Sequence, residues 1–175
     1  MVELFEEPFE GSKEVSYFGL KPLYYKAGVV KTVIGDMPVS VSREDYIKYL
    51  FIRHNDIDIF GYYAGFTALN KLHGTTQVPV LQEVRSNEVK EVQEYGVGFG
   101  VRFKIYPSDI LITHDNYIYL QVLDVVENWY DYFEENRLEC IRYAVKRQNL
   151  GWGGFEKHLD YYSSQTRRFL KDVFA

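Results

Sequence analysis

Residues 97–133 read VGFGVRFKIYPSDILITHDNYIYLQVLDVVENWYDYF, and they contain the two patterns that predict the fold class. Over residues 97–105 every second residue is apolar, which is typical of a strand with one buried face. From Tyr119 to Phe133 apolar residues recur at helical spacing with carboxylates between them, which is typical of an amphipathic helix. The stretch therefore predicts an α/β (α+β) fold that combines a small mixed or antiparallel sheet with helices.

Weaker patterns extend this prediction in both directions along the chain. Two short strands or a bulged hairpin, closing at Gly35-Asp36, are predicted over residues 23–34. Further strands are predicted over 80–84 and 110–112. Helices are predicted over 42–51, 62–72, 137–148 and 154–173. Ser42 is expected to cap the first helix, and Thr113 or Asp115 the helix of residues 113–135. The expected organisation is an acidic flexible arm over 1–16 and a single domain over 17–175. Within the domain, residues 22–112 form a strand-rich part with two helices, and residues 113–175 form a helical C-terminal half.

The composition is typical of a globular protein from a reducing compartment. Its 175 residues and 20.6 kDa suit one domain with a sizeable core. The single cysteine, Cys140, cannot form an intramolecular disulfide, and we expect it to be a small buried residue of a helix. The first residues lack the basic start and the apolar run of a secretory signal, and no stretch reaches the length of a membrane span. A cytoplasmic protein is therefore expected.

Charges are unevenly distributed along this chain of net charge −5. Residues 106–136 hold seven acidic side chains and no basic one, whereas residues 137–175 hold eight basic and four acidic side chains. Either the two segments neutralise each other in the folded protein, or one of them faces a partner of opposite charge. The candidate partner-binding residues of the two segments are Asp124, Glu127, Asp131, Arg142, Lys146, Arg147, Arg167 and Arg168.

The basic segment also allows a second interpretation, as a nucleic-acid-binding surface. Its Lys and Arg residues are interleaved with Tyr143, Trp152 and Tyr161, and cations alternating with aromatic rings are typical of such surfaces. The acidic total disfavours strong non-specific binding, although a local basic patch would withstand it. A transcriptional regulator that acts through the basic C-terminal helices is therefore the alternative function.

The sequence contains no pattern typical of a catalytic, metal or cofactor site. A strand follows the glycines of residues 96–100, whereas a helix follows a phosphate-binding loop, so we expect a bulge or a close backbone contact at Gly98 and Gly100. The four histidines are scattered and have no neighbouring cysteine, which does not predict metal binding; they are His54, His73, His114 and His158. We expect no catalytic residues, no metal and no cofactor. A second alternative is an enzyme whose site joins distant residues, with His114 or acidic side chains among them.

Residues 61–79 read GYYAGFTALNKLHGTTQVP, and they resemble the central signature of the AbiEi-type antitoxins of bacterial abortive-infection toxin–antitoxin systems. In that family Gly-Tyr-x-x-Gly starts a helix, and Leu-Gly-Leu-Thr-Thr-Gln-x-Pro leads into a strand that ends near an Asn, here Asn87. The matching positions are Gly61, Tyr62, Gly65, Asn70, Thr75, Thr76, Gln77 and Pro79. Looser similarity extends over about residues 22–135, and His73-Gly74 stands where the family pattern has Gly-Leu.

This resemblance implies a protein of phage defence that neutralises a nucleotidyltransferase-like toxin by binding it. Family members carry an N-terminal winged-helix DNA-binding domain, whereas only the acidic segment precedes the shared region here, so the resemblance implies the partner-binding region alone. The family motif is structural, and no catalytic residue is transferred with it. The preferred function is therefore a non-enzymatic antitoxin-like or regulatory domain that binds a partner protein.

Overall fold

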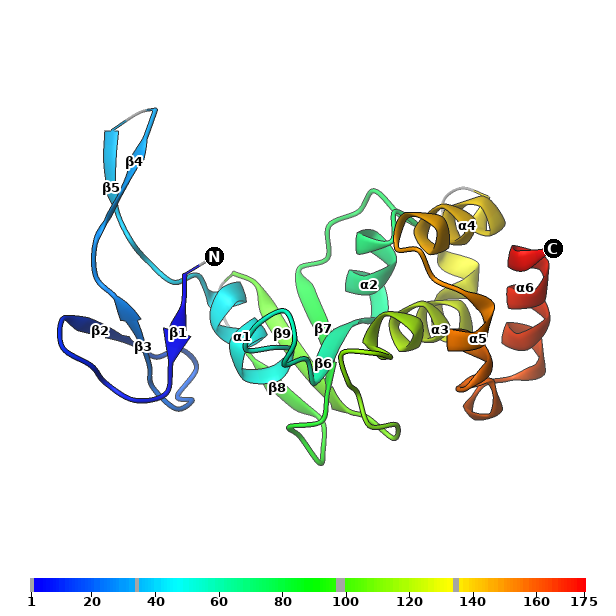
Figure 1. Cartoon of the computed structure of the whole chain (residues 1–175), viewed down its shortest axis with the longest axis horizontal. Helices are drawn as coiled ribbons and strands as arrows, with labels where there is room; N and C mark the ends of the chain where they lie inside the picture. Colours follow the sequence, from blue (N-terminus) through cyan, green and yellow to red (C-terminus); the bar gives the residue numbers. More distant parts are fainter. Residues whose placement is uncertain (1, 34, 97–99, 134–135) are drawn as a thin grey trace.

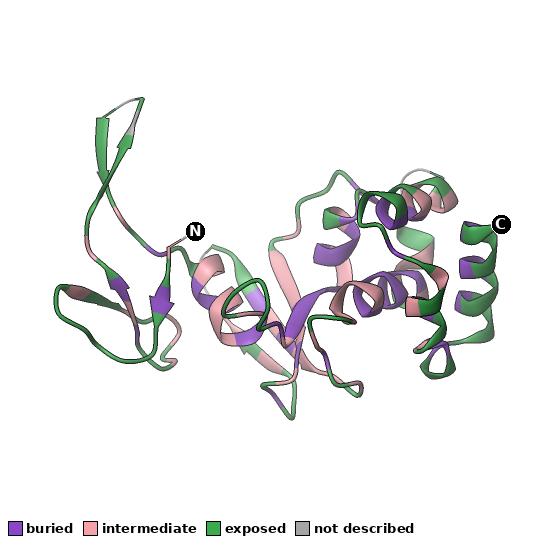
Figure 2. Ribbon diagram, viewed as in Figure 1, coloured by how far each residue is buried: buried purple, intermediate pink, exposed green. Residues whose placement is uncertain are grey.

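The computed structural model of the chain describes residues 2–33, 35–96, 100–133 and 136–175. The molecule is elongated, with small antiparallel sheets at the N-terminal end, a four-stranded sheet in the middle and a group of helices at the C-terminal end (Figure 1). Buried residues concentrate in the middle and at the helical end, whereas the strands near the N-terminus are largely exposed (Figure 2). The predicted mixed α/β fold with a helical C-terminal half is confirmed.

The N-terminal residues form a three-stranded antiparallel sheet instead of a flexible arm. Strand β3 (Leu23–Lys26) lies between β1 (Leu4–Phe5) and β2 (Ser12–Val15). Leu4 and Leu23 are buried in one cluster with Tyr46 from the following helix. The expectation of a weakly ordered segment over 1–16 is therefore corrected, because pairing with β3 orders it. Its glutamates and glycine interrupt the apolar pattern by which a strand is recognised in a sequence.

Strands β4 (Val29–Thr32) and β5 (Gly35–Pro38) form a separate hairpin that projects from the N-terminal end of the molecule (Figure 1). The two short strands predicted over 23–34 are present, but they do not pair with each other, because β3 pairs with β1 and β2. Gly35 begins β5, and Ile34 lies outside the described residues. The bulged-hairpin alternative for this segment is therefore wrong.

Helix α1 (Arg43–Phe51) begins where the sequence predicts. The Ser42 hydroxyl accepts a hydrogen bond from Asp45 N at 3.0 Å, which satisfies one of the free amides of the first turn. Tyr46 packs toward the N-terminal sheet, whereas Ile47 and Phe51 pack toward the central sheet. The helix thus joins the two sheets through opposite sides of its surface.

The central sheet has the strand order β6-β7-β9-β8, in which β7 and β9 are parallel and the other pairs are antiparallel. Its strands are β6 (Gly61–Ala64), β7 (Leu81–Ser86), β8 (Gln93–Tyr95) and β9 (Arg102–Pro107). Phe103 and Ile105 are buried as the alternation predicts, but β9 starts only at Arg102. Gly96 and Gly100 have φ values of 80° and 87°, which depart from regular extended backbone, and residues 97–99 lie outside the described part of the chain.

Two other predicted elements are corrected. Residues 62–64 belong to β6, and helix α2 (Gly65–Lys71) begins only after them, because pairing with β7 holds this segment extended. Residues 110–112 form no strand: the Asn87 side chain takes the place of a strand neighbour. Ile112 N donates to Asn87 Oδ1 at 3.0 Å, and Asn87 Nδ2 donates to Ile112 O at 2.8 Å.

All regular elements described in the C-terminal half are helices. It contains α3 (Tyr117–Trp129), η1 (Tyr130–Tyr132), α4 (Arg137–Arg147), α5 (Trp152–Glu156), η2 (Leu159–Tyr161) and α6 (Ser164–Phe174). Neither predicted side-chain cap of α3 forms: Asn116 is the N-cap residue, and Thr113 accepts from Tyr117 N through its backbone carbonyl. Among the helices of the described chain, none has the length and apolar character needed to cross a bilayer.

The single helix predicted over 154–173 is interrupted. Tyr162 adopts an extended conformation, and the Ser163 hydroxyl then caps α6 by accepting from Thr166 N. Its apolar stripe is nevertheless buried as predicted, in Phe155, Leu159, Tyr162, Phe169, Leu170 and Val173. The hydrophobic spacing thus identified the buried face, but a polar N-cap residue decides where the last helix begins.

Candidate functional site

The Asp124 carboxylate accepts hydrogen bonds from three side chains that come from three other segments. Its Oδ2 accepts hydrogen bonds from the Tyr62 hydroxyl and from Arg85 Nε, both at 2.8 Å. Its Oδ1 accepts a third hydrogen bond from the Tyr162 hydroxyl at 3.0 Å. Tyr62 lies on β6, Arg85 on β7 and Asp124 on α3, whereas Tyr162 closely precedes α6. This cluster, which we call the Asp124 junction, fastens the helical half to the central sheet.

Electrostatics keep the three donors of the Asp124 junction protonated. Burial raises the pKa of the Tyr62 and Tyr162 hydroxyls, and the neighbouring Asp124 carboxylate raises the pKa of both further, so both remain donors. Burial alone would lower the pKa of Arg85, but the Asp124 carboxylate outweighs it, so that the net shift is upward and the guanidinium stays charged. The junction therefore persists as an ion pair flanked by two neutral phenols.

Two small clefts flank the Asp124 junction. One has a volume of about 210 Å³ and lies between the Ser108–Ile110 segment and Tyr161. The other has a volume of about 230 Å³ and is lined by Glu83, Tyr106 and Trp129. Three donors already occupy the Asp124 carboxylate, so its arrangement is suited to holding the two halves together rather than to accepting a proton from a substrate.

The structure corrects the expectation that Asp124 lies on a partner-binding face. Only 11% of its side chain is exposed, because β6 and α6 both pack against α3, and every residue from Leu120 to Val126 is buried. Helical spacing cannot distinguish a charged residue in solvent from one that meets a partner across the core. Tyr62, a position of the 61–79 signature, provides that partner here.

The other acidic candidates differ in their surroundings. Glu127 is half-buried and accepts hydrogen bonds from Ser163 N at 3.1 Å and from Ser163 Oγ at 2.9 Å. The side chain of Asp131 is 91% exposed and lies 3.6 Å from Arg137. The Asp131–Arg137 pair provides part of the neutralisation between the acidic and basic segments that the charge pattern allowed. Glu134 and Glu135, which continue the predicted acidic face, lie outside the described residues.

Two of the basic candidates satisfy backbone carbonyls. Arg142 on α4 donates to Val173 O at 3.2 Å and to Asp172 O at 2.7 Å, and it thereby binds the C-terminal end of α6. Arg167 donates to Tyr162 O at 3.1 Å. Both side chains thus have structural contacts, although each remains partly exposed, and their partner-binding role stays a prediction.

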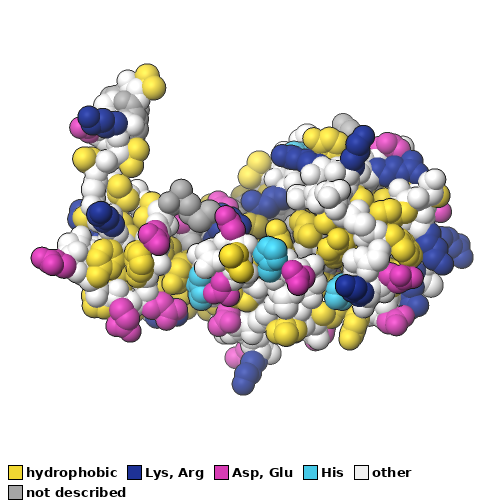
Figure 3. Space-filling view, in the orientation of Figure 1, with side chains coloured by type: hydrophobic (Ala, Val, Ile, Leu, Met, Phe, Trp, Pro, Cys, Tyr) yellow, Lys and Arg dark blue, Asp and Glu magenta, His cyan; other side chains and the backbone are white. Residues whose placement is uncertain are grey.

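The remaining basic candidates are exposed. Lys146 and Arg147 lie at the end of α4, and Arg168 lies on α6. Arg147 Nη1 donates to His73 Nε2 at 3.0 Å, and the ring of Tyr143, which is 56% exposed, lies 6.1 Å from the His73 ring. Lys and Arg side chains gather over the helical end of the molecule (Figure 3). We define the turn–α4 surface as His73, Tyr143, Lys146 and Arg147.

His73 belongs to the turn that follows α2 in the 61–79 signature. Its φ is 62°, in the left-handed region, and its N–H donates to Asn70 O while Gly74 N donates to Leu69 O. This is a Schellman ending, in which the left-handed position normally favours glycine. His73, and not the following Gly74, thus occupies the left-handed position at the end of the helix.

Other positions of the signature are also structural. The Asn70 amide donates to Thr75 O at 3.2 Å and to Gln77 O at 2.8 Å, which holds the turn before Pro79. A Cβ atom on Gly61 would lie 2.0 Å from Phe51 O, so only glycine fits there. Gly65 has a φ of 56°, and the Glu83 carboxylate accepts from Phe66 N at 2.9 Å beside it. Thr76 is exposed on this turn.

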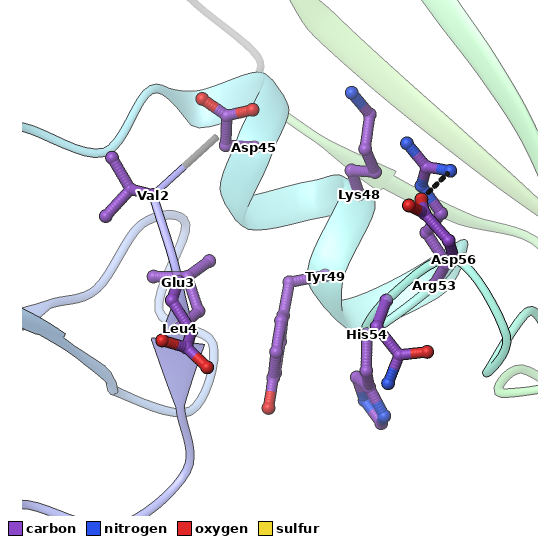
Figure 4. A pocket seen from close by; sticks show the side chains of 10 residues that line it. Val2, Glu3, Leu4, Asp45, Lys48, Tyr49, Arg53, His54 and Asp56 are labelled. Carbon is purple, nitrogen blue, oxygen red and sulfur yellow. Dashed lines mark hydrogen bonds and ion pairs between the residues drawn. The ribbon is translucent and has the colours of Figure 1, made fainter.

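A second polar region, which the sequence did not indicate, surrounds the end of α1. A cleft of about 310 Å³ lies between β1 and α1, and Lys48, Tyr49, Arg53 and His54 line it (Figure 4). His54 Nδ1 lies 2.7 Å from Asp58 Oδ2, and its ring lies 4.5 Å from the Tyr49 ring. These residues follow the ordinary polar pattern of a helix end, so no sequence signal distinguishes them.

The remaining candidates do not converge. Across residues 2–33, 35–96, 100–133 and 136–175, no three His, Cys, Asp or Glu side chains are grouped so that they could hold a metal ion. Cys140 is only half-buried, and its Sγ lies 3.8 Å from His73 O. His114 lies beside Asp115 on an exposed turn. Comparisons of the chain with protein-family models, with curated proteins and with solved structures find no match.

Proposed function

We propose that this chain is a non-enzymatic, AbiEi-like antitoxin domain that binds and neutralises a partner protein of a bacterial toxin–antitoxin system. The resemblance of residues 61–79 supports the family, and the left-handed φ of His73 fits it, because the family pattern has glycine at this position. Signature residues such as Asn70 and Gly61 support the backbone, which agrees with a motif that builds a binding domain.

The observation that carries this proposal is the contact between the signature turn and α4. Arg147 and Tyr143 on α4 meet His73 although they lie about 70 residues further along the chain, so the two elements form one exposed surface. This turn–α4 surface combines an aromatic ring with Lys146 and Arg147, and Tyr and Arg are enriched among residues that dominate binding energy. Its positive charge suits a partner with an acidic contact region.

The Asp124 junction also supports the proposed binding function. Its carboxylate, guanidinium and two phenols use their hydrogen-bonding capacity on one another. The cluster holds the helical half, and with it α4, against the sheet that carries the signature. A rigid platform of this kind keeps the turn–α4 surface in one shape before a partner arrives, which reduces the entropic cost of binding.

Co-expression with the product of the neighbouring gene tests the proposal. We expect the wild-type chain to restore growth that the neighbouring protein inhibits, and Lys146→Glu/Arg147→Glu to lose this effect. Lys13→Glu/Lys90→Glu is the matched control, because both lysines are exposed elsewhere and the net charge changes equally. Failure of the wild-type chain to restore growth would argue against the antitoxin function.

A nucleic-acid partner is the competing outcome. If the same surface binds DNA or RNA, the purified wild-type chain should retard a labelled duplex or single strand, and the retardation should weaken steeply as salt is raised. The charge-reversal variant would abolish that shift. Retardation without growth restoration would replace the antitoxin proposal with the regulator alternative.

A further inference from the structure

A fourth cleft lies on the opposite side of Lys48 and Arg53 from the N-terminal strand. It has a volume of about 180 Å³ and is formed by the end of α1, strand β6, the end of α2 and the start of α3. Its charged lining residues are Lys48, Arg53 and Lys71. Of the residues that the structure describes, no aspartate or glutamate lines this cleft. We call it the three-cation cleft.

The three cations are incompletely neutralised. Arg53 Nη1 lies 2.9 Å from Asp56, whose side chain is 91% exposed to solvent, and Lys71 Nζ lies 3.9 Å from Glu44. Lys48 has no carboxylate within 4.0 Å among the described residues. Figure 4 shows Lys48 and the Arg53–Asp56 pair extending away from Val2 and Glu3, on the far side of α1. Three like charges around one small space repel one another unless an anion lies between them.

The walls of the cleft are fixed by specific contacts. Gln121 Nε2 donates to Tyr63 O at 2.7 Å, and the Tyr63 hydroxyl donates to Glu44 at 2.8 Å. Lys71 Nζ lies 4.1 Å above the Tyr63 ring, which holds the ammonium at the rim through a cation–π contact. Gly61 lets β6 approach the end of α1 so closely that a side chain would clash with Phe51 O. The cations are thus presented by a preformed frame.

The start of α3 adds to the positive character of this frame. Tyr117 is the first residue of α3 and lines the cleft together with Gln121, one turn later. The N-terminal end of a helix carries a partial positive charge and free amides, which attract anions. The phenol of Tyr117 supplies a further possible hydrogen-bond donor to a bound group.

We propose that the three-cation cleft binds a phosphate group, held by Lys48, Arg53 and Lys71. The guanidinium of Arg53 matches phosphate oxygens in geometry, and the two ammonium groups supply point charges on either side. The volume is small beside typical pockets for drug-sized ligands, so it admits one phosphate with little else attached. This site goes beyond the proposed partner binding, because it involves none of the residues of the turn–α4 surface.

Titration of the purified chain with inorganic phosphate, at constant ionic strength set with chloride, tests this proposal by calorimetry and by thermal unfolding. The wild-type chain should bind phosphate saturably, and its melting temperature should rise with phosphate. Lys48→Met and Lys71→Met should each weaken the affinity about tenfold, as expected for the loss of one charge-assisted hydrogen bond. Lys90→Met is the matched control and should bind like the wild type, because Lys90 is exposed away from the cleft.

Adenosine 5′-monophosphate provides the second arm of the titration. Weaker binding of the nucleotide would identify the free anion as the source of the phosphate, and equal or tighter binding of the nucleotide would identify a nucleotide phosphate. Both results require that the Lys48 and Lys71 variants bind more weakly. Circular dichroism establishes that each variant is folded, and either variant alone suffices for the comparison. No saturable binding by the wild-type chain, or equal affinity in all four proteins, would overturn the proposal.

Discussion

The hydroxyl of Tyr62 on β6 donates a 2.8 Å hydrogen bond to the carboxylate of Asp124 on α3, although 62 residues separate them in the chain. Arg85 and Tyr162 bind the same carboxylate, so one side chain of the helical half holds the sheet and the segment before α6. A partly buried ion pair of this kind is sensitive to the loss of one partner, since the other charge is then left without compensation.

Asp124→Asn should lower the free energy of unfolding by about 3 kcal/mol, because it removes the charge that compensates Arg85. Asp131→Asn is the matched control two turns later, in η1, where the carboxylate is 91% exposed, and should change stability by less than about 0.5 kcal/mol. Urea unfolding followed by circular dichroism measures both values. Equal stability of the two variants would mean that the Asp124 junction does not hold the halves together.

Gly61→Ala should destabilise the protein by several kcal/mol or prevent folding. The new Cβ would lie 2.0 Å from Phe51 O and 2.8 Å from Arg85 O, and both are backbone atoms that cannot rotate away. Gly153→Ala introduces the same methyl group into α5, where nothing lies within 4 Å, and should stabilise the helix by about 0.5 to 1 kcal/mol. Thermal unfolding of the two variants tests whether Gly61→Ala lowers and Gly153→Ala raises the stability relative to the wild type.

His73→Gly should be more stable than His73→Ala by about 1 kcal/mol. Both substitutions remove the contact with Arg147, so their difference isolates the backbone conformation at a φ of 62°, which glycine adopts without a steric penalty. Chemical denaturation of both variants gives the comparison. If the alanine variant proved as stable as the glycine variant, the left-handed turn after α2 would be refuted.

Glu127 should give the protein a pH-dependent contribution to stability. Burial raises the pKa of its carboxyl, but hydrogen bonds from Thr166 and Ser163 outweigh burial and set the pKa below its ordinary value of 4.5. A lowered folded-state pKa means that the contribution is fully present above 4.5 and is lost as pH falls through the folded value.

We therefore expect the stability difference between the wild type and Glu127→Gln to shrink as pH is lowered from about 6 to about 3. Urea unfolding at a series of pH values measures this difference. A stability difference that stayed constant, or that increased in acid, would show that the carboxylate is not stabilised by Ser163 and Thr166.

Much of the fold could be predicted because local patterns agree with the tertiary structure. Ser42 caps α1, Phe103 and Ile105 face the core, and α4 occupies its expected range. In each case residues close together in the sequence determine the local structure, so the pattern can be recognised without knowledge of tertiary contacts. The breaks were harder to predict: Gly100, with a positive φ, interrupts the predicted alternation before β9, and an extended Tyr162 divides the last predicted helix.

The candidate sites were less accessible to sequence reasoning because their parts come from distant segments. Asp124 has the spacing of a solvated helix face, and only the packing of β6 and α6 against α3 reveals that it is buried. Lys48, Arg53 and Lys71 have no common motif, since Lys48 and Arg53 come from the end of α1 and Lys71 from the end of α2. The 61–79 signature did identify Tyr62 and the turn at His73, and both of these take part in long-range contacts.

The affinity between this chain and the purified product of its neighbouring gene, measured by isothermal titration calorimetry, tests the account most directly. We expect saturable binding by the wild type and by Lys13→Glu/Lys90→Glu, and at least about tenfold weaker binding by Lys146→Glu/Arg147→Glu. Absence of binding by the wild type, or the same affinity in all three proteins, would contradict the proposal that the turn–α4 surface recognises a partner protein.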